Sequence, residues 1–192
     1  MAKKPNYAKL MRRRNNRDLA KLLGANKHHV LHQRRLWTTL PPHVALRNDP
    51  DLIVLMDETV HKELHHNISP VPPLGTRATR CLLERYGQMK QCHSNLRSSK
   101  RGVYGIDMLI RALKAMVDDP YCHLTDLEVM QIDLMMMNLR QQAQFVVRSC
   151  SILRRHCAIR DIDLSLPDLP KELLGPISPI DEELALGAGV TN

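Results

Sequence analysis

Apolar residues recur at helical spacing through most of the second half of the chain. From Val129 to Cys157 they follow alternating steps of three and four residues, which is the pattern of a helix with one buried seam. Thr125-Asp-Leu-Glu128 forms a capping box, so we predict one helix over residues 125–157, about 50 Å long. The seam consists of Val129, Ile132, Met136, Leu139, Ala143, Val146, Cys150, Leu153 and Cys157.

A second apolar stripe begins beside the start of this seam. One stripe can pack on helices of the same chain, and the other can pack on another chain. We therefore expect a homo-oligomer or another protein partner to bind through residues 125–157. The second stripe consists of Leu127, Met130, Leu134 and Met137.

Two shorter helices are predicted before the long one. Apolar positions at helical spacing place them at residues 76–96 and 103–117, with a polar and basic break around residues 94–102. The second of them should end before Asp118-Asp119-Pro120. We group residues 76–160 as one helical domain, and residues 161–192 as an acidic, proline-rich tail.

The first part of the chain has a different pattern. Residues 5–23 predict a basic helix that ends near Gly24, within an N-terminal segment of residues 1–25. Residues 26–75 contain seven of the ten histidines and several prolines. Within them, the branched residues of Leu52-Ile-Val-Leu55 indicate a strand. Asp57 is suited to cap a helix over residues 58–66.

Charge is distributed very unevenly along the chain. Residues 1–35 hold eleven lysines and arginines against one acidic residue, a charge of +10. Residues 161–192 hold seven acidic residues against one lysine, a charge of −6. A basic terminus typically contacts nucleic-acid phosphates, although it can also be a solubilising end or be neutralised by the acidic tail.

Composition also indicates where the protein resides. No apolar run reaches the ~18–20 residues needed to cross a bilayer, and we see no secretory signal, so no membrane association is expected. The five cysteines contain no CxxC pair, which argues against a disulfide framework and for a reducing compartment. We therefore expect a cytoplasmic protein.

Four histidines form a pattern that suits metal chemistry. His28 and His29 are followed by His61-Lys-Glu-Leu-His65, and residues at i and i+4 share one face of a helix. Two imidazoles placed in this way can share a metal ion. A third imidazole from a neighbouring strand would complete a site that keeps an open position for water.

This arrangement resembles the HNH, or ββα-metal, endonucleases over about residues 26–67. Lys27 to Leu31 resembles the first strand of that family, Pro50 to Leu55 the second, and Glu58 to His66 the metal-bearing helix. Together with the helices predicted above, the resemblance gives a mainly α protein in which a small ββα unit lies between a basic N-terminal helix and a C-terminal helical region with one long helix. It also implies a divalent cofactor, Mg2+, Mn2+ or Zn2+.

The resemblance assigns roles residue by residue. It implies that His29 is the general base on a water, that His28 and His61 bind the metal, and that His65 is a further ligand. The asparagine of the family pattern is missing: Asp51 stands at its place, and Asn48 lies slightly earlier. We expect one of these two residues to support the site. The CxxC knuckles that often brace small nucleases are also absent.

The segments His32-Gln-Arg34-Arg35-Leu-Trp37 and Leu46-Arg47-Asn48-Asp49-Pro50 resemble a recurrent phage-type arrangement. This resemblance implies a phage-encoded protein in the host cytoplasm, with the virion as an alternative, and a phage protein as an alternative partner for residues 125–157.

Two functions remain open at this stage. The first function is a phage-type, metal-dependent endonuclease that hydrolyses DNA rather than RNA. The second is a non-catalytic nucleic-acid-binding or virion-assembly protein with a degenerate HNH-like fold. In both, the expected nucleic-acid contacts are Arg12, Arg13, Arg14, Arg17, Lys21, Arg34, Arg35 and Trp37.

Overall fold

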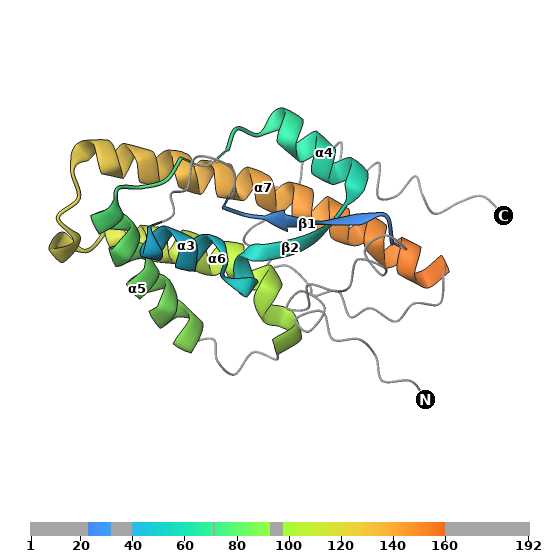
Figure 1. The fold of residues 1–192 in the computed structure, drawn as a ribbon, viewed down its shortest axis with the longest axis horizontal. Helices are drawn as coiled ribbons and strands as arrows, with labels where there is room; N and C mark the ends of the chain where they lie inside the picture. Colours follow the sequence, from blue (N-terminus) through green and yellow to red (C-terminus); the bar gives the residue numbers. More distant parts are fainter. Residues whose placement is uncertain (1–22, 32–39, 71, 93–97, 160–192) are drawn as a thin grey trace.

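A computed structural model of the chain describes residues 23–31, 40–70, 72–92 and 98–159 (Figure 1). Among these residues the fold is mainly helical, with one small antiparallel sheet, as the sequence predicts. The elements run in the order β1 (Ala25–His29), α3 (Pro41–Arg47), the 3-10 turn η1 (Pro50–Leu52), β2 (Ile53–Asp57), α4 (Glu58–Asn67), α5 (Thr76–Cys92), α6 (Ser98–Val117), the 3-10 turn η2 (Pro120–Cys122) and α7 (Asp126–Ile159).

The two strands pair in antiparallel register and lead directly into a helix. Ala25 stands opposite Asp57, and His29 stands opposite Ile53. The predicted strands are therefore present, although β1 begins and ends two residues earlier than expected and Pro50–Leu52 is a 3-10 turn. Because β2 ends at Asp57 and α4 begins at the next residue, strand and helix are held in a fixed relation.

Nothing in the sequence pattern predicted α3, the short helix between the strands. Pro41 and Pro42 stand at its first positions, where proline's missing N–H costs no hydrogen bond. The following turn η1 lies against α6 at an unusually close approach. A Cβ atom added to Gly105 would come within 1.7 Å of the Asp51 carbonyl oxygen, so only glycine fits there.

Helix α7 is the long helix that the apolar seam predicts, and it runs along the length of the described part of the chain (Figure 1). Its capping box is formed: the Thr125 N–H donates to Glu128, and the Glu128 N–H donates to Thr125 Oγ1. Of the nine seam residues, all but the half-buried Val129 are buried. The second stripe stays exposed, from 65% at Leu127 to 51% at Met137.

One hydrophobic core joins the sheet to the helices. It includes Val54 of β2, Leu82 of α5, Leu109 of α6 and Leu139 of α7. Helix α6 begins at Ser98, inside the segment predicted to be a break, and ends at Val117 as expected. Helix α5 packs on α6, while α4 and α7 pack against the sheet. The sheet and α4 are therefore held by a scaffold built from residues 76–159.

Several predictions concern residues outside the described part of the chain. These are the basic N-terminal helix of residues 5–23, of which the structure describes only Leu23, and the acidic tail of residues 161–192. Every helix in the described ranges is too short or too polar to span a lipid bilayer.

Candidate metal centre

Two of the candidate ligands project from α4, whose position is fixed by its first residues. Asp57 caps the helix as predicted, with its carboxylate accepting from the backbone N–H groups of Thr59 and Val60. Asp57 in turn donates its own N–H to Ser149 Oγ of α7 at 2.6 Å. Four residues apart on this helix, His61 and His65 face each other, with their Nε2 atoms 3.0 Å apart.

The third candidate ligand comes from β1. The His28 ring centroid lies 5.3 Å from that of His61 and 5.5 Å from that of His65. One nitrogen atom from each of the three rings lies within 4.8 Å of the other two. The structure therefore brings together the three histidines that the sequence analysis named as metal ligands.

Burial gives His28 a different character from its two neighbours. His28 is 3% exposed, whereas His61 is half-buried and His65 is exposed. Burial is the main reason that the pKa of His28 falls to about 3, and the nearby imidazoles lower it further, while a hydrogen bond to Gln142 acts in the opposite direction. His28 is thus a neutral imidazole near pH 7, which is the form that binds metals.

The donor set fits a transition metal better than magnesium. Imidazole nitrogen is a good ligand for Zn2+, whereas Mg2+ prefers oxygen. Two nitrogens bound to one tetrahedral Zn2+ at about 2.05 Å stand about 3.3 Å apart, close to the 3.0 Å between the Nε2 atoms of His61 and His65. Three protein ligands leave one position open, as in catalytic rather than structural zinc sites.

His29, the predicted general base, borders the same pocket as His28 and His65. Its Nδ1 lies 3.5 Å from the carbonyl oxygen of Arg47, at the end of α3. A carbonyl oxygen can only accept, so His29 donates its Nδ1–H in this contact and, when neutral, carries its ring lone pair on Nε2. Helix α3 therefore orients the histidine that follows the metal-ligand candidate in β1.

The two residues expected to support the site have other positions. Asp51 is buried, but its carboxylate pairs with Lys90 of α5 at 3.0 Å, and Lys90 also holds Asp49. Asn48 caps the end of α3 with its backbone. Neither is one of the three clustered histidines, and their supporting role stays a prediction. The η1 turn directs Asp51 toward α5 and α6.

A residue that the sequence analysis missed contacts the site from α7. Gln142 is 4% exposed, and its Oε1 lies 2.9 Å from His28 Nε2, across 114 residues of sequence. Gln142 stands next to Ala143 of the seam. The sequence alone does not indicate which residue a glutamine at this position contacts. The predicted nucleic-acid contacts, from Arg12 to Trp37, lie outside the described residues.

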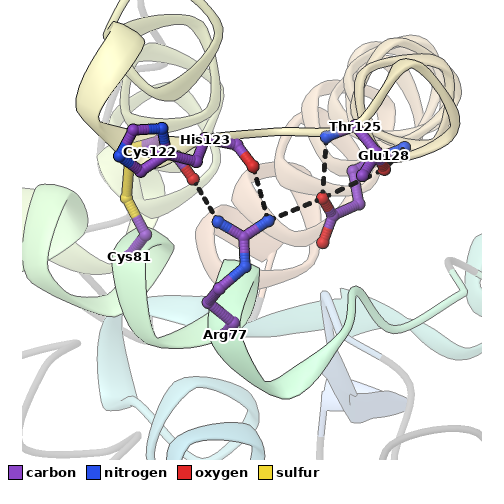
Figure 2. A network of polar contacts seen from close by, with 6 residues as sticks. All are labelled: Arg77, Cys81, Cys122, His123, Thr125 and Glu128. Carbon is purple, nitrogen blue, oxygen red and sulfur yellow. Dashed lines mark hydrogen bonds and ion pairs between the residues drawn. A yellow bond between two sulfur atoms is a disulfide. The ribbon is translucent and has the colours of Figure 1, made fainter.

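A second polar cluster lies where α5 meets the start of α7, and Figure 2 shows its six residues. Arg77 donates to the carbonyl oxygens of Cys122 and His123 and pairs with Glu128. Cys81 and Cys122 form a disulfide across 41 residues, a pairing that the sequence analysis, which argued against a disulfide framework, did not predict. The fold brings the η2 turn onto α5, a proximity that cysteine spacing alone does not reveal.

Comparisons with protein-family models, with curated proteins and with solved structures find no match to this chain.

Proposed function

We propose that this protein is a metal-dependent nuclease, with His28, His61 and His65 as metal ligands and His29 as the proton acceptor. The observation that carries the proposal is the meeting of three imidazoles, one from β1 and two from one face of α4. The ββα order of these elements, which resembles the HNH endonucleases, supports it.

The four histidines have separate roles in the proposed reaction. His28, His61 and His65 hold a cation, which when bound would act as a Lewis acid on the phosphate and offset charge on the leaving oxygen. His29, oriented by the Arg47 carbonyl, takes a proton from the attacking water. The pocket beside them is bordered by His28, His29, Val30, Leu64, His65, Ile68, Ser69, Pro70 and Gln142.

The proposed substrate is DNA. The support comes from the sequence, where residues 1–35 carry +10 and include the strand that holds His28 and His29. A basic segment of this kind would bind phosphates without base specificity and concentrate the polymer near the pocket. Of the three candidate cofactors, Zn2+ fits the nitrogen ligands best, Mn2+ is an alternative, and Mg2+ fits least.

Plasmid nicking in the presence of each cation tests the proposal. We expect Zn2+ or Mn2+ to support nicking, and His29→Ala to reduce the rate by about 10²- to 10⁴-fold while Zn2+ still binds. His61→Ala should remove both nicking and Zn2+ binding. His66→Ala is the matched control, because His66 is an exposed neighbour on the same helix. Equal rates for wild type and His29→Ala would contradict the proposal.

A second candidate function is an assembly protein that binds nucleic acid without cleaving it. The observation favouring it is the exposed stripe of α7, since Leu127, Met130, Leu134 and Met137 repeat the three–four spacing that pairs helices. In this case a second copy of the chain covers the stripe. Light scattering should then show a dimer that Leu134→Asp dissociates without unfolding. A monomeric wild type would exclude this role for the stripe.

A further inference from the structure

We infer that Gln142 of α7 is a positioning residue for the metal site, because it fixes which nitrogen of His28 carries the hydrogen. The inference rests on the proposed metal-binding role of His28. It assigns Nε2–H to the hydrogen bond with Gln142 and leaves Nδ1 as the ligand atom. This goes beyond the ligand set, since it names the atom that binds and the residue that selects it.

The orientation of the Gln142 side chain follows from its neighbours. Its nitrogen Nε2 lies 3.2 Å from the carbonyl oxygen of Val30 and 2.7 Å from Asn138 Oδ1. The Val30 carbonyl can only accept, so the Gln142 atom facing it must be the NH2 group. The other end of the amide, Oε1, therefore faces His28.

The orientation of Asn138 is fixed in the same way and agrees with this assignment. Asn138 Nδ2 donates to the carbonyl oxygen of Ser69 at 2.6 Å, which leaves Oδ1 to accept from Gln142. Two backbone carbonyls thus set the direction of a chain of amides from Ser69 through Asn138 and Gln142 to His28. A flip of either amide would place two acceptors or two donors against each other.

The consequence for His28 is a single tautomer. Oε1 of Gln142 is an acceptor, so His28 Nε2 must donate to it at 2.9 Å. A neutral imidazole then carries its lone pair on Nδ1. Metal-binding histidines usually donate their other ring N–H to an oxygen acceptor, and Gln142 supplies that acceptor here.

The two adjacent histidines of β1 are therefore set in opposite tautomers by two different elements. Gln142 of α7 places the hydrogen of His28 on Nε2, and Arg47 of α3 places the hydrogen of His29 on Nδ1. Two neighbouring histidines can thus have different roles, one as a metal ligand and the next as a proton acceptor. Burial holds the His28 side of this arrangement, since both His28 and Gln142 are almost fully enclosed.

The experiment reads the tautomer directly and then tests its effect on metal binding. Long-range 1H–15N spectra of the metal-free protein near pH 8 should show the His28 hydrogen on Nε2. Gln142→Met, which keeps length but removes the acceptor, should weaken Zn2+ binding by about 10- to 100-fold. Gln142→Glu keeps the acceptor toward His28 but loses the donor to the Val30 carbonyl and Asn138, so it should restore only part of that affinity. Gln144→Met, exposed on the same helix, is the control.

Two results would overturn the inference. One is a wild-type His28 with its hydrogen on Nδ1, and the other is unchanged Zn2+ affinity in a folded Gln142→Met protein. The tautomer is read without metal or DNA, so a protein that binds Zn2+ and never nicks DNA would sink the nuclease proposal alone. If Gln142→Met fails to fold, the wild-type spectrum and Gln142→Glu still decide the question.

Discussion

Two polar clusters lie along α7, one at its start and one near its middle, and they differ in how their donors and acceptors balance. At the start, Arg77 donates to two backbone carbonyls and to the Glu128 carboxylate (Figure 2). The donors of this cluster are therefore matched by acceptors, and its positive charge is matched by a negative one. Near the middle, three imidazoles gather their nitrogens in one place. Nitrogen lone pairs gathered in this way suit a shared cation.

This difference separates a structural cluster from a candidate site more clearly than residue type does. Both clusters contain histidine, and both join α7 to an earlier helix. The cluster at the start also contains a disulfide and a capping box, which have ordinary structural roles. The histidine cluster instead places a buried imidazole beside an exposed one, so it is anchored on one side and open on the other.

The largest expected effect comes from the disulfide of the structural cluster. Cys81→Ser should lower the free energy of unfolding by about 4 kcal/mol, because the bond closes a loop of 41 residues that the unfolded chain would otherwise leave open. Urea denaturation measures the loss, and reductant should have no further effect on the variant. The Zn2+ affinity should stay as in wild type. A joint loss of stability and Zn2+ binding would show that the two clusters are coupled.

The second effect concerns pH in the metal-free protein. The folded pKa of His28 is about 3 and its ordinary value is 6.5, so below pH 6.5 the unfolded chain binds a proton that the folded chain does not. Stability should therefore fall as the pH drops from 6.5 toward 3. At pH 4.5 the loss is about 3 kcal/mol.

The structural cluster should respond in a different pH window. Hydrogen bonds from Thr125 and the charge of Arg77 hold the pKa of Glu128 below 4.5, so its contribution is lost only under more acidic conditions. Urea midpoints between pH 8 and 4.5 should thus report on His28, and His28→Gln should flatten the profile. An NMR titration of wild type is the direct check. Protonation of His28 above pH 5 in the folded protein would contradict the expectation.

Local patterns were enough to predict the scaffold. The seam of α7, its capping box and the Asp57 cap each depend on residues within a few positions of one another, and all are present. The strands were placed two or three residues from their observed bounds, since apolar runs mark strand ends poorly. Helix α3 was missed because Pro41-Pro42 is equally typical of a turn.

The site was predictable only where its residues are close in sequence or belong to adjacent elements. His61 and His65 share a helix face, and β2 leads into that helix. Because β1 was expected to pair with β2, His28 could be predicted as a third ligand. Gln142 lies 114 residues from His28, and no local spacing connects them. The pairing of Asp51 with Lys90, and of Cys81 with Cys122, likewise depends on how α5 packs, which a single sequence does not reveal.

A smaller effect is expected from Arg77→Met. The substitution leaves two backbone carbonyls and Glu128 without this donor, but the guanidinium is about half exposed and water can replace it. We therefore expect a loss of about 1 kcal/mol in the free energy of unfolding. Arg80→Met, an exposed arginine on the same helix, is the control and should be neutral. Zn2+ affinity should be unaffected, and a change in it would break the separation between the clusters.

The smallest effect should come from Asn138→Ala, which acts on the histidine cluster from one step further away. The substitution removes the acceptor that holds one N–H of Gln142, while the Val30 carbonyl still holds the other. Gln142 should then keep its orientation for most of the time. Zn2+ affinity should fall about two- to five-fold, equivalent to ~0.5–1 kcal/mol, measured by competition with a chelator. Gln141→Ala, exposed one turn along α7, should leave the affinity unchanged. A loss as large as that of Gln142→Met would mean that Asn138, rather than the Val30 carbonyl, sets the direction of the amide chain.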